Sequence, residues 1–415
     1  MRIAYLCSDP GVPLSGSKGA SIHVRELSRS LRGLGHDVRV VAARAGGRAP
    51  PGYEVPIVTL QQEPLDERLV ALLSTDPSAG EAVARDVRST LAAVSLRHRA
   101  LPLLRSLEPD LVYERYALFG TAGVALAREL GVPLILEVNA PLSLEQERHR
   151  GLAYGAASRE LERIILRSAD RVVAVSSVLE GWLVAAGVPS ERVTVLPNAV
   201  DPARFDPGRV ERDAVRSRLG LADEPIVGFL GTLKPWHDVA ALVRAVAMLR
   251  HGSPAPHLLV VGEGPEREHL QELARSEGIA EASTFTGAVP HAAVGAFVSA
   301  FDVAVVPYGR APSSYFSPLK LFECLAAERP VVAADVGDVG HCVRNGETGI
   351  LYPAGDAEAL AGAIDTLLGE RARASSLARA GREHVARHHT WERNARLVVD
   401  IADEVVARKS VEVSA

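Results

Sequence analysis

The residues whose types and spacing best suit chemistry lie together in the segment 316–323, which reads FSPLKLFE. Ser317 followed by Pro318 is typical of a helix start, with serine as N-cap and proline at the first helical position. Lys320 and Glu323 then share one face of the helix, while the apolar residues around them are buried. A lysine near a helix N-terminus attracts anions, and a carboxylate accepts hydrogen bonds from hydroxyl groups. The segment therefore suits a diphosphate beside a diol; the alternative is a surface Lys–Glu pair worth about 0.3 kcal/mol.

Three loops contain further groups that could bind an anion. Lys18 and Gly19 end a glycine-containing loop before a predicted helix, where backbone N–H groups can approach a phosphate. The segment 229–237, FLGTLKPWH, places Lys234 and His237 after a predicted strand. Gly262, Glu263 and Gly264 follow another strand, at the end of a sheet where open α/β folds bind ligands. The alternatives are a surface loop, a solvated lysine with a structural histidine, and an ordinary strand-to-helix turn.

Two polar residues end a strand in the first half of the chain. Glu137 and Asn139 close the predicted strand 134–138, and polar groups at such a strand end are candidate contacts for an acceptor substrate. The alternative for Asn139 is an ordinary turn-forming asparagine.

The elements that must position these residues form two alternating series. The first series of β-rich runs lies at 2–7, 38–43, 111–114, 134–138, 171–175 and 193–196. After a turn-rich linker at 196–208, the second series lies at 226–230, 258–261, 283–286, 303–306 and 331–334. Helical patterns fall between these runs, and strands alternating with helices predict parallel, doubly wound sheets. We expect an α/β protein with two Rossmann-like domains, 1–200 and 201–389, facing across a ligand-binding cleft.

Composition restricts the function classes. The net charge of −5 and the pI near 6.3 give no indication of nucleic-acid binding. Three cysteines, Cys7, Cys324 and Cys342, lack metal-ligand spacing and indicate a reducing, cytoplasmic compartment. No apolar run is long enough for a transmembrane helix. Arginines between 85 and 99 are compatible with peripheral membrane contact, although an ordinary surface helix explains them as well.

Taken together, these motifs resemble the retaining GT-B glycosyltransferases of family GT4 over nearly the whole chain. The resemblance rests on the loop 18–24 with its His23, on 109–115, on the interdomain segment 196–201 and, most specifically, on 316–332. Trp391 opens a final helix that resembles the family's crossing back to the first domain, so 390–415 is expected to pack on domain 1–200. The resemblance implies sugar transfer from a nucleoside-diphosphate sugar, a UDP- or GDP-sugar, with retention of configuration.

The resemblance also assigns expected roles to individual residues. It implies that Glu323 holds the nucleotide ribose and that Gly19 approaches the donor phosphate. The loop containing Val289 would contact the base, with Gly262–Gly264 nearby. It implies acceptor-side positions for Lys18, His23, Glu137 and Asn139. The donor site would also include Thr232, His237, Glu263, Tyr315, Phe316, Ser317, Pro318 and Leu319.

Three positions depart from the family's pattern. The first glutamate of a pair common in the family falls at Tyr315, which cannot accept sugar hydroxyl protons as a carboxylate does. A basic pair that clamps the diphosphate falls at Thr232 and His237, so Lys234 or Lys320 is expected to supply the missing charge and to stabilise the leaving group. An acceptor-side histidine of many relatives falls near Asn139, so no histidine there can act as a base.

The expected enzyme needs no essential metal and no cofactor beyond its donor substrate. Its partners would be a small-molecule donor and an acceptor, either a secondary metabolite or a cell-envelope glycan or glycolipid, and the chain would be a monomer or homodimer. Two other functions fit the same residues: a GT-B-type sugar-nucleotide epimerase, and a non-catalytic nucleotide-sugar-binding protein. An epimerase needs no acceptor, and a binding protein would not turn over its donor.

Overall fold

The structure is a computed structural model that describes residues 1–47, 52–60, 63–77, 79–208, 212–221, 224–250, 252, 255–310, 315 and 317–414. The chain divides into two compact units. Unit 1 contains Met1–Pro197 and Trp391–Ala415, and unit 2 contains Asn198–Thr390. The predicted boundaries, after residues 200 and 389, lie within three residues of these divisions.

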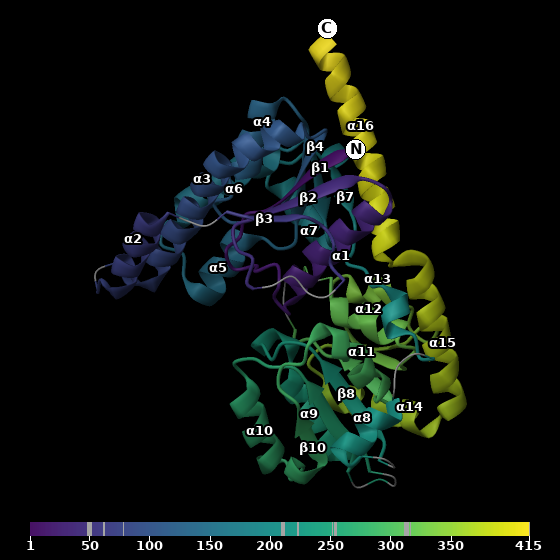
Figure 1. The fold of residues 1–415 in the computed structure, drawn as a ribbon. Coiled ribbons are helices and arrows are strands. Elements are labelled where there is room, and N and C mark those ends of the chain that lie inside the picture. The colour runs from purple at the N-terminus through teal and green to yellow at the C-terminus, as the bar shows by residue number, and fades with distance from the viewer. Residues whose placement is uncertain are drawn as a thin grey trace. The chain divides into compact units, whose positions relative to one another are not determined.

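Unit 1 is built on a seven-stranded parallel sheet with strand order β3-β2-β1-β4-β5-β6-β7. The strands are β1 (Arg2–Cys7), β2 (Asp37–Ala42), β3 (Ile57–Thr59), β4 (Leu111–Arg115), β5 (Leu134–Val138), β6 (Arg171–Ala174) and β7 (Val193–Val195). The helices are α1 (Gly19–Gly33), α2 (Pro64–Thr75), α3 (Gly80–Leu107), α4 (Ala122–Leu130), α5 (Leu142–Arg150), α6 (Gly155–Ser168), α7 (Ser177–Ala185) and α16 (Trp391–Ser414). Helices cover both faces of this sheet (Figure 1).

Unit 2 is built on a six-stranded parallel sheet with strand order β10-β9-β8-β11-β12-β13. The strands are β8 (Ile226–Leu230), β9 (His257–Val261), β10 (Ser283–Phe285), β11 (Val303–Val306), β12 (Val331–Asp335) and β13 (Ile350–Pro353). The helices are α8 (Arg212–Leu219), α9 (Val239–Leu249), α10 (Arg267–Ser276), α11 (His291–Ser299), α12 (Leu319–Ala326), α13 (Val339–Cys342), α14 (Ala357–Gly369) and α15 (Arg371–His388).

The apolar strand sequences explain these sheets. Strands β8, β9 and β11 are buried along their whole length, as expected of parallel strands that are covered by helices on both faces. The strand order reverses between β1 and β4 in unit 1 and between β8 and β11 in unit 2. Ligands of open α/β sheets bind beyond the carboxyl ends of strands at such reversals. The prediction of two doubly wound α/β domains is confirmed.

Several elements were missing from the sequence-based prediction. The region 61–101 gives a weak pattern, yet it forms α2 and most of α3. The buried face of α3 consists largely of alanines, such as Ala84, Ala92 and Ala100, so its apolar periodicity is faint. Helix α16 continues to Ser414.

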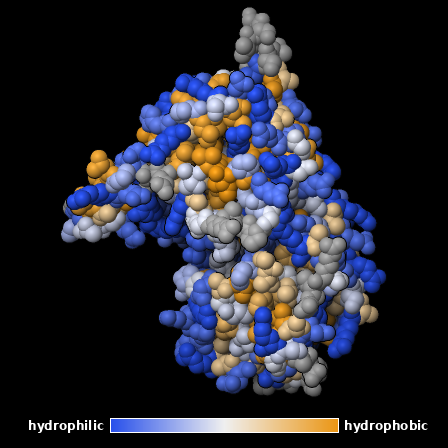
Figure 2. Space-filling model, viewed as in Figure 1, coloured by the Kyte–Doolittle hydropathy of each residue, from blue (hydrophilic) through white to orange (hydrophobic). Residues whose placement is uncertain are grey.

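The arginines of α3 mostly have local partners. Arg97 pairs with Glu129, and Arg85 donates to the carbonyl oxygen of Arg150. This arrangement is typical of an ordinary surface helix. Apolar side chains gather among hydrophilic ones over α2 (Figure 2), where Leu65 and Leu72 are 79% and 60% exposed. Peripheral membrane contact stays a prediction. Within the described residues, no helix is both long and apolar enough to cross a membrane.

Candidate functional site

The loops that follow β8 and β9 lie directly against each other in unit 2. The Gly231 N–H donates to the carbonyl oxygen of Val261 over 3.0 Å, and the Leu233 N–H donates to that of Glu263 over 3.0 Å. A Cβ atom on Gly262 would lie 1.8 Å from the Gly231 carbonyl oxygen, and one on Gly264 would lie 2.3 Å from that of Leu233. Glycine is therefore required at both positions by backbone packing alone. The Glu263 side chain is exposed and pairs with Arg267.

Helix α12 begins one residue later than predicted. Its N-cap is Pro318, and Leu319 is its first residue. The hydroxyl group of Ser317 does not cap the helix, because it accepts a hydrogen bond from the Asn198 N–H over 2.8 Å. The Asn198 side-chain amide also donates to the Ser317 carbonyl oxygen over 2.5 Å. Ser317 thus ties the start of α12 to the first residue of unit 2, whereas Phe316 lies outside the described residues.

Lys320 is a buried cation that forms no salt bridge with any carboxylate of the described residues. Its side chain is only 8% exposed, and within the described structure its Nζ makes no hydrogen bond. Nζ lies 4.6 Å from the ring centre of Phe229 and 5.3 Å from that of Tyr308. These cation–π contacts recover part of the lost hydration. Burial nevertheless lowers the pKa of Lys320 to about 7, so an anion reaching Nζ would find an unsatisfied donor.

His237 supplies no positive charge at this site. Its Nδ1 bonds to the carbonyl oxygen of Thr232, which can only accept, so Nδ1 carries the proton. Burial, and then the charge of Lys320, lowers the pKa of His237 to about 3. The ring is therefore neutral near pH 7, with Nε2 as an acceptor. Lys234 is half-buried, and its Nζ lies 5.7 Å from the ring centre of Trp236.

Glu323 has a partner that the sequence did not reveal. It is 7% exposed, and its Oε1 lies 3.1 Å from the Nε2 of His291, the first residue of α11. The half-buried Val289 lies two residues before His291 and packs against the core. The pair thus joins the loop predicted to contact the base to the carboxylate predicted to hold the ribose. Tyr315, the position at which the family's first glutamate is expected, is half-buried.

The predicted acceptor-side residues of unit 1 divide into exposed and buried groups. Lys18 is the N-cap of α1, Gly19 is its first residue, and both are exposed. His23 is buried, and its ring contacts that of Trp391 edge-on, with centres 4.9 Å apart. Its Nε2 lies 2.7 Å from Oε2 of Glu137.

Glu137 is the centre of a saturated hydrogen-bond network. Besides His23, it accepts from the Tyr113 hydroxyl over 2.6 Å, from Arg115 over 3.0 Å and from Asn139 over 2.6 Å. Burial alone would raise its pKa, but His23, Arg115 and Tyr113 together lower it to about 2. The carboxylate is 1% exposed, so its observed contacts are structural, and the half-buried Asn139 is the better placed of the two to meet an acceptor.

We expect Glu137→Gln to destabilise unit 1 by about 3–5 kcal/mol at pH 7, because four donors lose a buried charged acceptor. The folded-state pKa lies below the usual value, so the stabilising contribution of Glu137 is present above pH 4.5 and disappears as the pH falls through about 2. Urea unfolding of both proteins at pH 7 and pH 3 measures this difference. A difference that stays constant over this range, or a Glu137→Gln protein as stable as the wild type, would contradict the assignment.

A cavity of about 920 Å³ opens in unit 1 beyond the carboxyl ends of β1, β2 and β4. Its described lining contains no aromatic ring and carries four arginines and four acidic residues. Among them are Asp9, Arg44, Arg88, Glu145 and Arg150. A lining with this many donors and acceptors suits a ligand that carries many hydroxyl groups.

The structure thus gathers most of the predicted donor residues at one edge of the sheet in unit 2. The groups added to them by the structure are Phe229, His291, Tyr308 and Asn198. His291 could have been proposed from its place beside the Val289 loop, but the pairing with a residue 32 positions away has no local signal. No group of three or more metal-ligating side chains occurs in the described part of the chain.

Comparisons with known proteins match both units. The family model described as Glycosyltransferase Family 4 matches residues 17–204, and that described as Glycosyl transferases group 1 matches residues 224–370. A D-inositol 3-phosphate glycosyltransferase from Acidothermus cellulolyticus is 30% identical, covering 97% of this chain and 88% of the relative. A glycogen synthase from Mycobacterium tuberculosis is 28% identical, covering 90% of this chain and 88% of the relative.

Solved structures show the same fold. The sucrose-phosphate synthase of Thermosynechococcus elongatus superposes with a TM-score of 0.76 at 24% identity, covering 98% of this chain and 100% of the other. The HepE protein of Anabaena in complex with UDP-glucose superposes with a TM-score of 0.75 at 18% identity, covering 97% and 100%. The two sheets, the family models and the full-length relatives agree: the chain is an enzyme of glycosyltransferase family 4, with the GT-B fold.

Proposed function

We propose that the protein transfers a sugar from a nucleoside-diphosphate sugar held by unit 2 to a polyhydroxylated acceptor held by unit 1. The observation that carries this proposal is the buried, unpartnered Nζ of Lys320 beside the Gly231 loop. A diphosphate bound there would satisfy a donor that the described residues leave unsatisfied. HepE, a relative in fold, was solved with UDP-glucose, which supports a donor of this class.

The leaving diphosphate needs stabilisation as its bond to the sugar breaks. We propose that Lys320 and the backbone N–H groups at the start of α12 supply positive charge at that position. With His237 neutral, this charge comes from Lys320. We propose retention of the anomeric configuration through a front-face path, in which the leaving diphosphate accepts the acceptor's proton and no metal is required.

The acceptor proposal rests on the cavity of unit 1. Its charged, ring-free lining favours a sugar or polyol over a flat apolar molecule. Two relatives carry names that include such compounds, inositol phosphate and glycogen. The three cysteines are buried free thiols, which supports a cytoplasmic enzyme.

The test has two stages. A thermal-shift screen with UDP-, GDP- and TDP-sugars identifies the donor, since a ligand at 100 times its Kd stabilises the fold by about 2.7 kcal/mol. NMR of the product formed with that donor and a polyol acceptor then shows the anomeric configuration. Inversion would refute the retaining path, and conversion of the donor without an acceptor would favour an epimerase.

A further inference from the structure

A second cavity lies in unit 2 at the opposite edge of the sheet from the donor loops. It has a volume of about 750 Å³. Its lining includes Pro225, Pro256 and Pro330, which immediately precede β8, β9 and β12. The carboxyl ends of these strands carry the loops described above, so a strand of five residues, about 16 Å long, separates the two sites.

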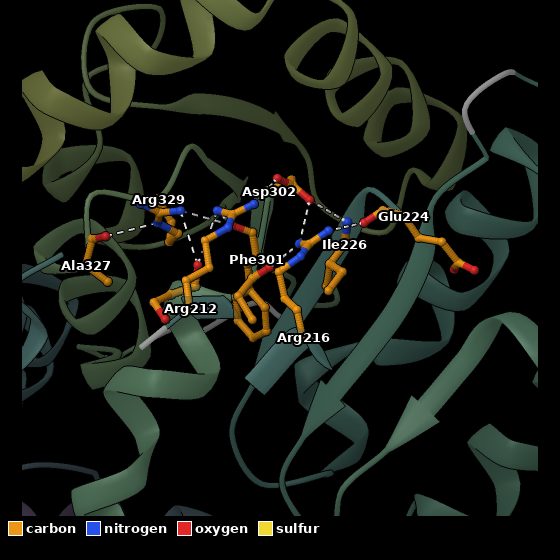
Figure 3. Close-up of polar contacts among 10 residues, drawn as sticks. Arg212, Arg216, Glu224, Ile226, Phe301, Asp302, Ala327 and Arg329 are labelled. Atoms are coloured by element: carbon orange, nitrogen blue, oxygen red, sulfur yellow. Dashed lines mark hydrogen bonds and ion pairs between the residues drawn. The ribbon is translucent and has the colours of Figure 1, made fainter. Parts of the chain in front are cut away.

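Three arginines from two segments converge on one wall of this cavity (Figure 3). Arg212 and Arg216 belong to α8, and Arg329 lies just before β12. Asp302 is the carboxylate that pairs with two of them, at 2.5 Å from Arg212 and 3.1 Å from Arg216. It also accepts from the Ile226 N–H over 2.8 Å, so its oxygens are already occupied.

Arg212 and Arg329 share the same weak acceptors. Each guanidinium donates through Nη1 to the carbonyl oxygens of Ser299 and Phe301, over 3.3–3.4 Å. The two guanidinium groups therefore lie side by side at the end of α11. Among the described carboxylates, Asp302 pairs with Arg212, and Arg329 donates to backbone carbonyl oxygens. Burial and the charge of Arg212 lower the pKa of Arg329 to about 10. An anion bridging the two guanidinium groups would relieve this repulsion.

A further part of the lining also favours an anion. It is formed by the first turns of α15, which contribute Arg371, Ala374 and Ser375. The first turn of this 18-residue helix contains no acidic residue, its N-cap Glu370 pairs with Arg373, and Arg371 is exposed. The partial positive charge of this helix terminus thus borders the same cavity as the arginines.

Acidic side chains complete the lining and indicate what the anion carries. Besides Asp302, they are Glu224, Glu328 and Asp365. Glu224 lies 3.2 Å from His257, whereas the other two are available to accept hydrogen bonds from hydroxyl groups. A phosphate alone would use only the arginines. We propose that this cavity binds a phosphomonoester of a polyhydroxylated compound, a sugar phosphate, with the phosphate held by Arg212, Arg329 and Arg371.

Calorimetric titration of the full chain with glucose 6-phosphate tests this site. We expect Arg371→Gln and Arg329→Gln each to weaken binding roughly tenfold or more, because each removes a charge-assisted bond to the phosphate. Arg371 is exposed, so its replacement should leave the fold intact even if Arg329→Gln does not. Arg387→Gln, on the far end of the same helix, is the matched control and should bind as the wild type does.

A Lys320→Met variant separates this site from the proposed donor site. It should keep full affinity for glucose 6-phosphate, whatever it does to nucleotide-sugar binding. Glucose, which lacks the phosphate, should bind much more weakly than its phosphate ester. The proposal fails if the wild type does not bind, if Arg371→Gln and Arg329→Gln bind normally, or if Lys320→Met abolishes binding.

Discussion

Replacing Lys320 with methionine is expected to lower kcat/KM for the nucleotide-sugar donor by about 100-fold or more while making the unliganded protein more stable. The first effect follows because Lys320 is the buried cation that we place on the diphosphate. The second follows because the wild-type protein buries an ammonium group that, among the described residues, contacts the rings of Phe229 and Tyr308 and makes no hydrogen bond. A purely structural lysine would not combine a loss of activity with a gain in stability.

The gain in stability should depend on pH in a definite direction. Folding lowers the pKa of Lys320 from 10.5 to about 7. Between pH 7 and pH 10.5, the unfolded chain therefore binds a proton at Lys320 that the folded protein does not. Wild-type stability attributable to this group therefore rises with pH across that window, and the cost of the lysine is largest below pH 7. The difference in Tm between Lys320→Met and wild type should be greatest near pH 6 and shrink toward pH 10.

Donor affinity of the wild type should show the opposite trend. Above pH 7 the free protein holds Lys320 increasingly neutral, and binding a diphosphate then requires uptake of a proton. Affinity should fall by up to about tenfold per pH unit above 7, and Lys320→Met should remove this slope. Lys234→Met is the matched control, since Lys234 is half-buried over Trp236, and it should change affinity far less. Equal losses in the two variants would contradict the assignment.

The sequence predicts the two sheets well because each strand is a short apolar run between turn residues, and that pattern is local. It fails for α3, where a buried face made of alanines gives little contrast with the exposed face. The sequence also misplaces the start of α12. A serine–proline pair predicts an N-cap, but the sequence pattern does not show that the serine hydroxyl already accepts a hydrogen bond from another residue. The competing partner, Asn198, lies 119 positions away.

The same limit applies to the candidate site. Charge type could be read from the sequence, and Lys320 and Glu323 were identified in that way. The protonation state could not be read from the sequence, because it depends on burial. His237 is neutral owing to its burial and the nearby Lys320, whereas Glu137 stays charged through His23, Arg115 and Tyr113, which lie 22 or more positions away. Spacing therefore suggests which groups could meet a phosphate, and packing decides which of them carry charge.

Glu323→Gln is expected to weaken donor binding by about 10- to 100-fold, because an amide replaces the carboxylate that we propose accepts from the ribose hydroxyls. His291 lies 3.1 Å from Oε1, which leaves Oε2 to face the ribose. Nucleotide affinity, measured by calorimetry, gives the test. A 2′,3′-dideoxynucleotide should bind the wild type as weakly as the natural nucleotide binds Glu323→Gln, and the variant should not distinguish the two ligands.

His291 acts in this account as a positioning residue, so its loss should be smaller and should depend on Glu323. We expect His291→Ala to raise KM for the donor about 3- to 10-fold with little change in kcat, and His291→Gln to restore part of the affinity through its own N–H donor. In a Glu323→Gln background, His291→Ala should have almost no further effect, because the two changes act on one contact. Additive losses in the double variant would show instead that His291 supports the fold of α11 independently, and the ribose assignment would then rest on Glu323 alone.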